Sequence, residues 1–125
     1  EMCRVLISIK HFCGYCSTVR SRISIEQGLT EEKLMKMEEF ETSDMFDVRE
    51  KAALRFATAF KLSDDAIDND DVYEDLKKHF SEEEIIELGL LCAETDGVGK
   101  FARSLRMRTW DEACDIQPGL RRKVS

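Results

Sequence analysis

Two cysteines three residues apart, Cys13 and Cys16, carry the clearest potential for chemistry in this chain. Side chains at positions i and i+3 of a helix lie on one face, close enough for a short-loop disulfide. In such a pair one thiolate attacks an oxidant or a disulfide, and the other cysteine resolves the sulfenic acid or mixed disulfide that forms. The spacing therefore predicts thiol redox chemistry.

Three alternative interpretations fit the same spacing. Zinc needs two more ligands, for which Cys3 and His11 are candidates, but no second Cys-x-x-Cys or His-x3-His pattern accompanies them. Thioredoxin-like chemistry requires a βαβ context, which the helical pattern of this chain disfavours. The third alternative is a purely structural pair of cysteines.

The composition of the chain limits which cellular compartment and which binding partners are expected. The chain has 125 residues, five cysteines and a net charge of −7. An odd and sparse set of cysteines predicts a reducing, cytoplasmic compartment rather than a secreted disulfide scaffold. The negative charge disfavours nucleic acid and anionic lipid as partners. The most apolar stretch, residues 85–93, is too short to span a membrane, so no membrane partner is expected.

The hydrophobic pattern predicts an all-α, single-domain bundle of about six helices. The chain contains one proline, Pro118, and this scarcity favours helices. Helices are expected over residues 2–12, 12–28, 30–37, 47–62, 72–80 and 85–105, the second one ending at Gly28. For residues 5–9 a strand is the competing prediction, because their β-branched side chains also alternate.

Local signals mark where several of these helices begin or change. N-terminal caps are expected at Thr30, at Asp47 and at Ser81. Gly97 and Gly99 interrupt the last helical pattern, and each costs about 1 kcal/mol relative to alanine inside a helix. We expect a kink, a break or a close backbone contact there.

Three blocks of the sequence resemble one family. Glu1, eleven intervening residues and then Cys13-Gly14-Tyr15-Cys16 resemble the Glu-x11-Cys-x-x-Cys motif of the carboxymuconolactone decarboxylase / alkylhydroperoxidase D-like (AhpD-like) family. Residues 48–57 and 79–88 are similar to its "erAaLryA" and "hFsdeEiveL" segments. The resemblance covers most of the chain. It predicts an AhpD-like domain over residues 1–117, followed by a basic tail over 118–125.

The resemblance implies a helical fold that oligomerises, often as a trimer or hexamer. In the peroxidase members of the family, the second cysteine, here Cys16, attacks a small peroxide, and the first, Cys13, resolves it as a disulfide. The glutamate, here Glu1, and a histidine move protons to and from the thiols. An external dithiol then reduces the disulfide, and neither a metal nor an organic cofactor is needed. Decarboxylase members generally lack the cysteine pair, so decarboxylation is the weaker expectation.

This chain departs from the family at two places. Arg20 stands where the family has its histidine, and an arginine cannot relay a proton at neutral pH. As an i+4 neighbour it could still lower the pKa of Cys16, and His11 is an alternative base. Residues 94–101 carry acids and glycines where the family is rich in asparagine. The expected function is a thiol-dependent peroxidase or disulfide oxidoreductase; the alternative is a non-catalytic helical oligomer or interaction subunit with a decayed site.

Overall fold

The computed structural model describes residues 1–62, 65 and 67–106, with only the backbone of Gly14 and Tyr15. These residues contain helices and no strand, which confirms the all-α prediction. The boundary predicted between residues 117 and 118, and the basic tail, lie outside the described residues. The helices are α1 (Met2–Lys10), α2 (Gly14–Thr18), α3 (Arg22–Glu26), α4 (Glu31–Met35), the 3-10 helix η1 (Met37–Glu39), α5 (Val48–Leu62), α6 (Asp70–Lys77) and α7 (Glu82–Ser104).

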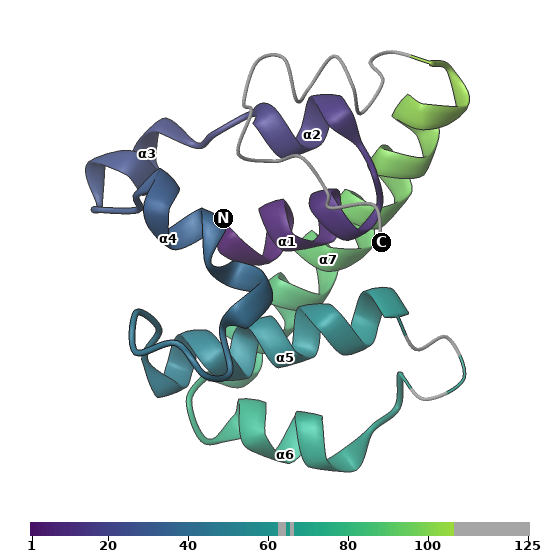
Figure 1. Cartoon of the computed structure of the whole chain (residues 1–125). Helices are drawn as coiled ribbons and strands as arrows, with labels where there is room; N and C mark the ends of the chain where they lie inside the picture. The colour runs from purple at the N-terminus through teal and green to yellow at the C-terminus, as the bar shows by residue number, and fades with distance from the viewer. Residues whose placement is uncertain (63–64, 66, 107–125) are drawn as a thin grey trace.

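Helix α1 is the centre of the bundle (Figure 1). It packs against α2, α5 and α7, which are the elements that surround it in Figure 1. Helix α6 lies on the side of α5 that faces away from α1 and also contacts the start of α7. The arrangement places the turn between α1 and α2, at the end of which Cys13 caps α2, beside the C-terminal half of α7.

The burial of α1 explains why its sequence was compatible with a strand. Val5, Leu6 and Ile7 are fully buried although they are consecutive, because neighbouring helices cover α1 on several sides. Periodicity alone does not separate a helix from a strand in so short an apolar run, so these residues also resemble a buried strand. The helix is the correct alternative.

The single helix predicted over residues 12–28 is wrong, because the structure has two short helices there. Val19 and Ser21 both adopt extended backbone conformations, with ψ of 140° and 122°, and they separate α2 from α3. Ser21 begins α3 by accepting a hydrogen bond from the backbone N–H of Ser24 at 3.3 Å. Gly28 follows the end of α3 with φ of +95°, the left-handed conformation for which glycine is suited.

The predicted caps are confirmed at all three positions. The Thr30 side chain accepts from Lys33 N, and Ser81 forms the predicted reciprocal capping box at the start of α7. Asp47 and Glu50 make the same reciprocal pair at the start of α5, each side chain accepting from the other's backbone N–H. These contacts join residues three apart, which is why local sequence was sufficient to find them.

Helix α7 runs without interruption through Gly97 and Gly99, so the helix does not break there. It is the longest helix described, at 23 residues. Among the residues that the structure describes, no helix combines the length and the apolar composition needed to cross a membrane.

Candidate active site

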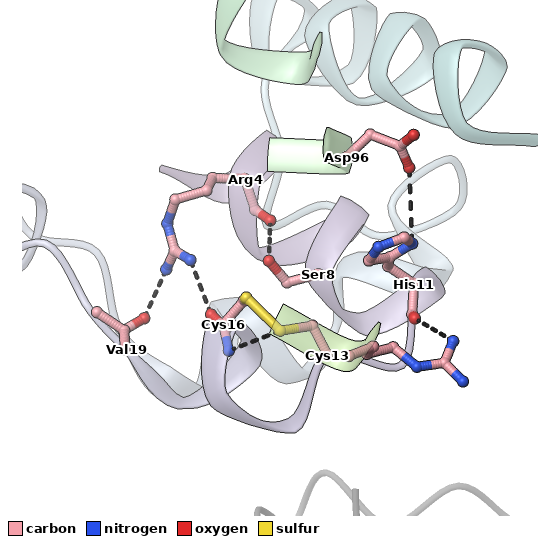
Figure 2. The surroundings of a disulfide bond; sticks show 8 residues. Arg4, Ser8, His11, Cys13, Cys16, Val19 and Asp96 are labelled. Atoms are coloured by element: carbon pink, nitrogen blue, oxygen red, sulfur yellow. Dashed lines mark hydrogen bonds and ion pairs between the residues drawn. A yellow bond between two sulfur atoms is a disulfide. The ribbon is translucent and has the colours of Figure 1, made fainter. Parts of the chain in front are cut away.

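Cys13 and Cys16 are joined by a disulfide, with their Cα atoms 5.2 Å apart (Figure 2). The chain reaches this position by a sharp turn, in which His11 ends α1 and Phe12 adopts a left-handed φ of +59°. Cys13 then caps α2, and its Sγ accepts a hydrogen bond from Cys16 N at 3.2 Å. The short-loop disulfide expected from the spacing is therefore confirmed.

The two cysteines differ in their access to solvent. Cys13 is 1% exposed, whereas Cys16 is half-buried. Cys16 also lines a cleft of about 230 Å³ between α1 and α7, together with Arg4, Ser8, Leu91, Glu94, Thr95 and Val98. A small molecule that enters this cleft meets Cys16 and not Cys13.

The cleft has apolar walls and two charged side chains. Leu91 and Val98 of α7 supply apolar surface. The Ser8 and Thr95 hydroxyls each donate to a carbonyl of their own helix at 2.7 Å. The charged side chains that line the cleft are Arg4 of α1 and Glu94 of α7. Residues 94–101, where the chain departs from the family pattern, do border this site.

Glu1 is bound to Arg4. Its carboxylate accepts from Arg4 Nε at 2.9 Å, from Arg4 Nη2 at 2.8 Å and from Ser21 N at 2.8 Å. The hydrogen bonds from Arg4 are the main cause that lowers the pKa of Glu1 to about 2, against the effect of its burial. Glu1 is therefore a carboxylate at neutral pH. Its participation in proton transfer stays a prediction.

Arg4 connects Glu1 to the cysteine turn, and sequence reasoning missed it. Its Nη1 donates to the carbonyl oxygen of Cys16 at 2.7 Å, and its Nη2 donates to that of Val19 at 2.5 Å. Both bonds are drawn in Figure 2. A basic side chain at these positions satisfies carbonyl groups that the end of α2 leaves without helical partners. The signal that could have identified Arg4 is its i+3 spacing from Glu1 on α1.

His11 is buried on the other side of the disulfide from Arg4 in the view of Figure 2. Its Nδ1 lies 3.6 Å from Asp96 Oδ1, and its buried Nε2 has no hydrogen-bond partner among the described residues. Burial is the largest cause that lowers the pKa of His11, and the charge of Lys61 adds to it. Asp96 is itself paired with Lys61 at 2.6 Å. The role of His11 as an alternative base stays a prediction.

No family model matches the sequence. Over 88 residues, or 70% of this chain, the sequence is 34% identical to an uncharacterized protein of Mycobacterium tuberculosis. That stretch is 31% of the relative, so the chain spans about a third of its length. The sequence is also 23% identical over 108 residues to the uncharacterized protein YdfG of Bacillus subtilis, covering 86% of this chain and 74% of YdfG.

Two solved structures superpose on most of the chain. One is the Agrobacterium tumefaciens protein ATU0492, described as a protein of unknown function and a candidate antioxidant defence protein AhpD. It matches with a TM-score of 0.77 and 24% identity, over 86% of this chain and 74% of its own. The other is the debrominase Bmp8, with a TM-score of 0.75 and 25% identity, over 96% of this chain and 64% of its own. The chain therefore has an AhpD-like fold.

In this AhpD-like chain, Arg20 ties the end of α2 to α4. Its side chain is only 8% exposed and donates from Nε to Glu31 Oε1 at 2.7 Å. Its Nη1 also donates to the carbonyl oxygens of Ser17 and Val19 at 2.5 Å and 2.9 Å. These contacts hold the extended segment between α2 and α3. The predicted effect of Arg20 on the Cys16 thiol stays a prediction.

Cys3 and Cys92 belong to the core of the AhpD-like fold. Cys3 donates from Sγ to the Ala53 carbonyl at 3.5 Å, and Cys92 is fully buried. Burial raises the pKa of Cys3 to about 11 and that of Cys92 to about 12, so both remain thiols. Within the described ranges, no group of three or more His, Cys, Asp or Glu side chains could hold a metal ion. Cys114 lies outside the described residues.

Proposed function

We propose that this AhpD-like chain is a thiol-dependent peroxidase in which Cys16 attacks a small peroxide and Cys13 resolves the product. The observation that carries the proposal is the Cys13–Cys16 disulfide, with Cys16 opening on a cleft while Cys13 is buried behind it. The two cysteines are thus close enough to exchange a bond and unequal in their access to a substrate.

The reaction is a two-electron reduction of the peroxide. The Cys16 thiolate attacks one peroxide oxygen, the O–O bond breaks, and the other oxygen leaves as an alcohol or water after taking a proton. Cys16 is then a sulfenic acid. The Cys13 thiol attacks the Cys16 sulfur, the S–S bond forms, and water leaves. The two thiols have lost two electrons, which the peroxide has gained.

Regeneration requires an external dithiol, of the kind a reducing compartment supplies. Its thiolate attacks the Cys16 sulfur, since Cys13 is 1% exposed, and the S–S bond breaks with Cys13 leaving as a thiolate. The backbone N–H of Cys16, which already donates to Cys13 Sγ, stabilises that leaving group. The second thiol of the donor then attacks the donor sulfur of the mixed disulfide, the bond to Cys16 breaks with Cys16 leaving as a thiolate, and the donor is released with an intramolecular disulfide.

Self-association into a trimer or hexamer is part of the same proposal. Helix α7 and its C-terminal cap expose a series of large apolar side chains, including Ile86, Leu90, Phe101 and the cap residue Leu105, each about 60% exposed or more. Their spacing puts apolar surface along much of one long helix, which another copy could cover. Sedimentation equilibrium of the full chain measures the number of copies, and a monomer at micromolar concentration would contradict this part.

The peroxidase proposal is tested by following the disulfide directly. The reduced protein is treated with hydrogen peroxide or an organic hydroperoxide, and the Cys13–Cys16 disulfide is measured by peptide mass spectrometry. Turnover is measured separately with dithiothreitol as the dithiol donor. We expect stoichiometric disulfide formation and catalytic peroxide consumption, both lost in Cys16→Ser. In Cys13→Ser, oxidation should stop at a Cys16 sulfenic acid that dimedone traps.

Cys92→Ala is the matched control, because it removes a buried thiol on another part of the fold and should retain turnover. If the folded, reduced wild type forms no Cys13–Cys16 disulfide with either peroxide, the peroxidase proposal is wrong. In that case the non-catalytic alternative, a helical oligomer or interaction subunit, would be the better account of the chain.

A further inference from the structure

We propose that Arg4 is the group that stabilises the Cys16 thiolate of the reduced protein, and that Glu1 holds Arg4 in place for this role. The inference deepens the proposed peroxidase function and rests on it, since that function requires a reactive thiolate at Cys16. Arg4 is thereby a positioning and charge-setting residue that neither the family motif nor the sequence pattern had indicated.

In the part of the chain that the structure describes, four of the five N–H groups of Arg4 donate hydrogen bonds, and one remains available. A guanidinium has five N–H groups. Nε and Nη2 together use three of them, two on Glu1 and one on the Val19 carbonyl. One N–H of Nη1 donates to the Cys16 carbonyl, and the second N–H of Nη1 has no hydrogen-bond partner among the described residues. This remaining donor is on the nitrogen that binds Cys16.

The position of Arg4 is set from both ends. The Glu1 carboxylate binds the Nε–Nη2 edge of Arg4 in a bidentate ion pair. The Ser21 N–H donates to the same carboxylate and orients it. The Nη1 end of Arg4 reaches past this pair to Cys16, and Arg4 and Cys16 line the same cleft. The cation therefore lies between the carboxylate and the cysteine. When the disulfide is reduced, the positive charge of Arg4 acts on the Cys16 sulfur more strongly than the negative charge of Glu1 does.

The other charged or titratable groups around Cys16 favour or oppose a thiolate as follows. Glu94 approaches from α7 along the cleft and opposes it by repulsion. Cys13, in the same turn, competes for the negative charge. Arg20 favours it from the segment after α2, although that guanidinium is committed to Glu31 and two carbonyls. Arg4 is the cation that lines the cleft itself.

The test measures the Cys16 thiol without requiring peroxide turnover. The reduced protein is alkylated with iodoacetamide from pH 5 to 10, and the rate at the Cys16 peptide is followed by mass spectrometry. The variants are Arg4→Gln and Glu1→Gln. Arg49→Gln is the matched control, because it breaks a similar arginine–glutamate pair on a remote surface, Arg49–Glu84.

Arg4→Gln and Glu1→Gln should shift the Cys16 pKa in opposite directions. Loss of the cation should raise the pKa by roughly one unit, which lowers the alkylation rate near neutral pH by about tenfold. Loss of the Glu1 charge should lower the pKa of Cys16: the glutamine oxygen and the carbonyls of Cys16 and Val19 still hold Arg4, and the charge of Arg4 is then unopposed. Arg49→Gln should leave it unchanged. A purely structural role for the pair would produce no such opposite shifts.

Two results would overturn the inference: shifts of the same sign in both variants, or shifts no larger than that of the control. If Arg4→Gln does not fold, Glu1→Gln still decides the matter through the sign of its shift. Opposite shifts in a wild-type protein that consumes no peroxide would support the inference while contradicting the proposed function.

Discussion

The imidazole of His11 packs directly against the backbone of Gly99. A Cβ atom added at Gly99 would lie 2.7 Å from His11 Nε2 and closer still to Cδ2, whereas one added at Gly97 would meet nothing within 4 Å. The contact joins the end of α1, where the cysteine turn begins, to α7. It explains why a glycine occurs inside a long helix at this position.

The first prediction contrasts these two glycines. Gly99→Ala should destabilise the fold by about 1–3 kcal/mol, because the buried ring of His11 must move to admit the methyl group. Gly97→Ala should stabilise it by up to about 1 kcal/mol, since alanine is the better helix former and the site is open. Urea denaturation of both variants measures the difference. Equal effects would show that the contact with His11 does not determine the stability at residue 99.

The second prediction concerns the pH dependence that His11 gives to stability. Because its pKa is lowered in the fold, the unfolded chain binds a proton at a higher pH than the folded chain does. The free energy of unfolding should therefore be fully retained above about pH 6.5 and fall as the pH drops from there towards the folded-state pKa. Chemical denaturation at a series of pH values between 5 and 8 measures this slope.

His11→Gln supplies the comparison for that slope. The variant has no titrating group at residue 11, so its stability should change less between pH 7 and pH 5 than that of the wild type. A wild-type slope of opposite sign, with greater stability at pH 5, would contradict a buried neutral histidine.

The third prediction concerns Glu1 in acid. Its pKa in the fold is about 2, below the ordinary value of 4.5, so the pair with Arg4 stabilises the fold above pH 4.5. That contribution, up to about 3 kcal/mol, should be lost as the pH falls from 4.5 towards 2. In Glu1→Gln this part of the acid dependence should disappear. An unchanged acid profile in the variant would show that the ion pair contributes little to stability.

The fourth prediction concerns the capping box of α7. Ser81→Ala removes the acceptor for Glu84 N and should cost about 0.5–2 kcal/mol. Glu84→Gln keeps an acceptor for the Ser81 N–H and should retain most of this stability. Thermal or urea unfolding compares the two. If both variants lose the same free energy, the ion pair of Glu84 with Arg49 contributes as much to stability as the cap does.

The fifth prediction separates the cysteines by reactivity. Cys3 and Cys92 are buried, with pKa values raised to about 11 and about 12, so the folded, reduced protein should leave both unmodified by iodoacetamide at pH 8. Cys16 should be modified first. Peptide mass spectrometry reads each site, and full modification in urea confirms that the reagent is sufficient. Rapid labelling of Cys92 in the folded protein would contradict its place in the core.

Sequence reasoning succeeded where the interacting residues are near each other in the chain. The caps at Thr30, Asp47 and Ser81 depend on a side chain and a backbone N–H three residues away. It failed over residues 12–28, where one apolar pattern continued across two helices. The backbone between them is extended at Val19, whose carbonyl is bound by Arg4 from another helix. A helical period cannot report such a contact.

The sequence by itself determined the cysteine pair, the all-α class and the helix starts at Thr30, Asp47 and Ser81, because short-range geometry specifies each of them. Only the tertiary structure decided that Cys16 opens on a cleft while Cys13 is buried, that Arg4 joins Glu1 to Cys16, and that His11 rests on Gly99. Those relationships depend on how α2 and α7 pack against α1. Packing brings together residues that are distant in the chain, and no local spacing records which of them will meet.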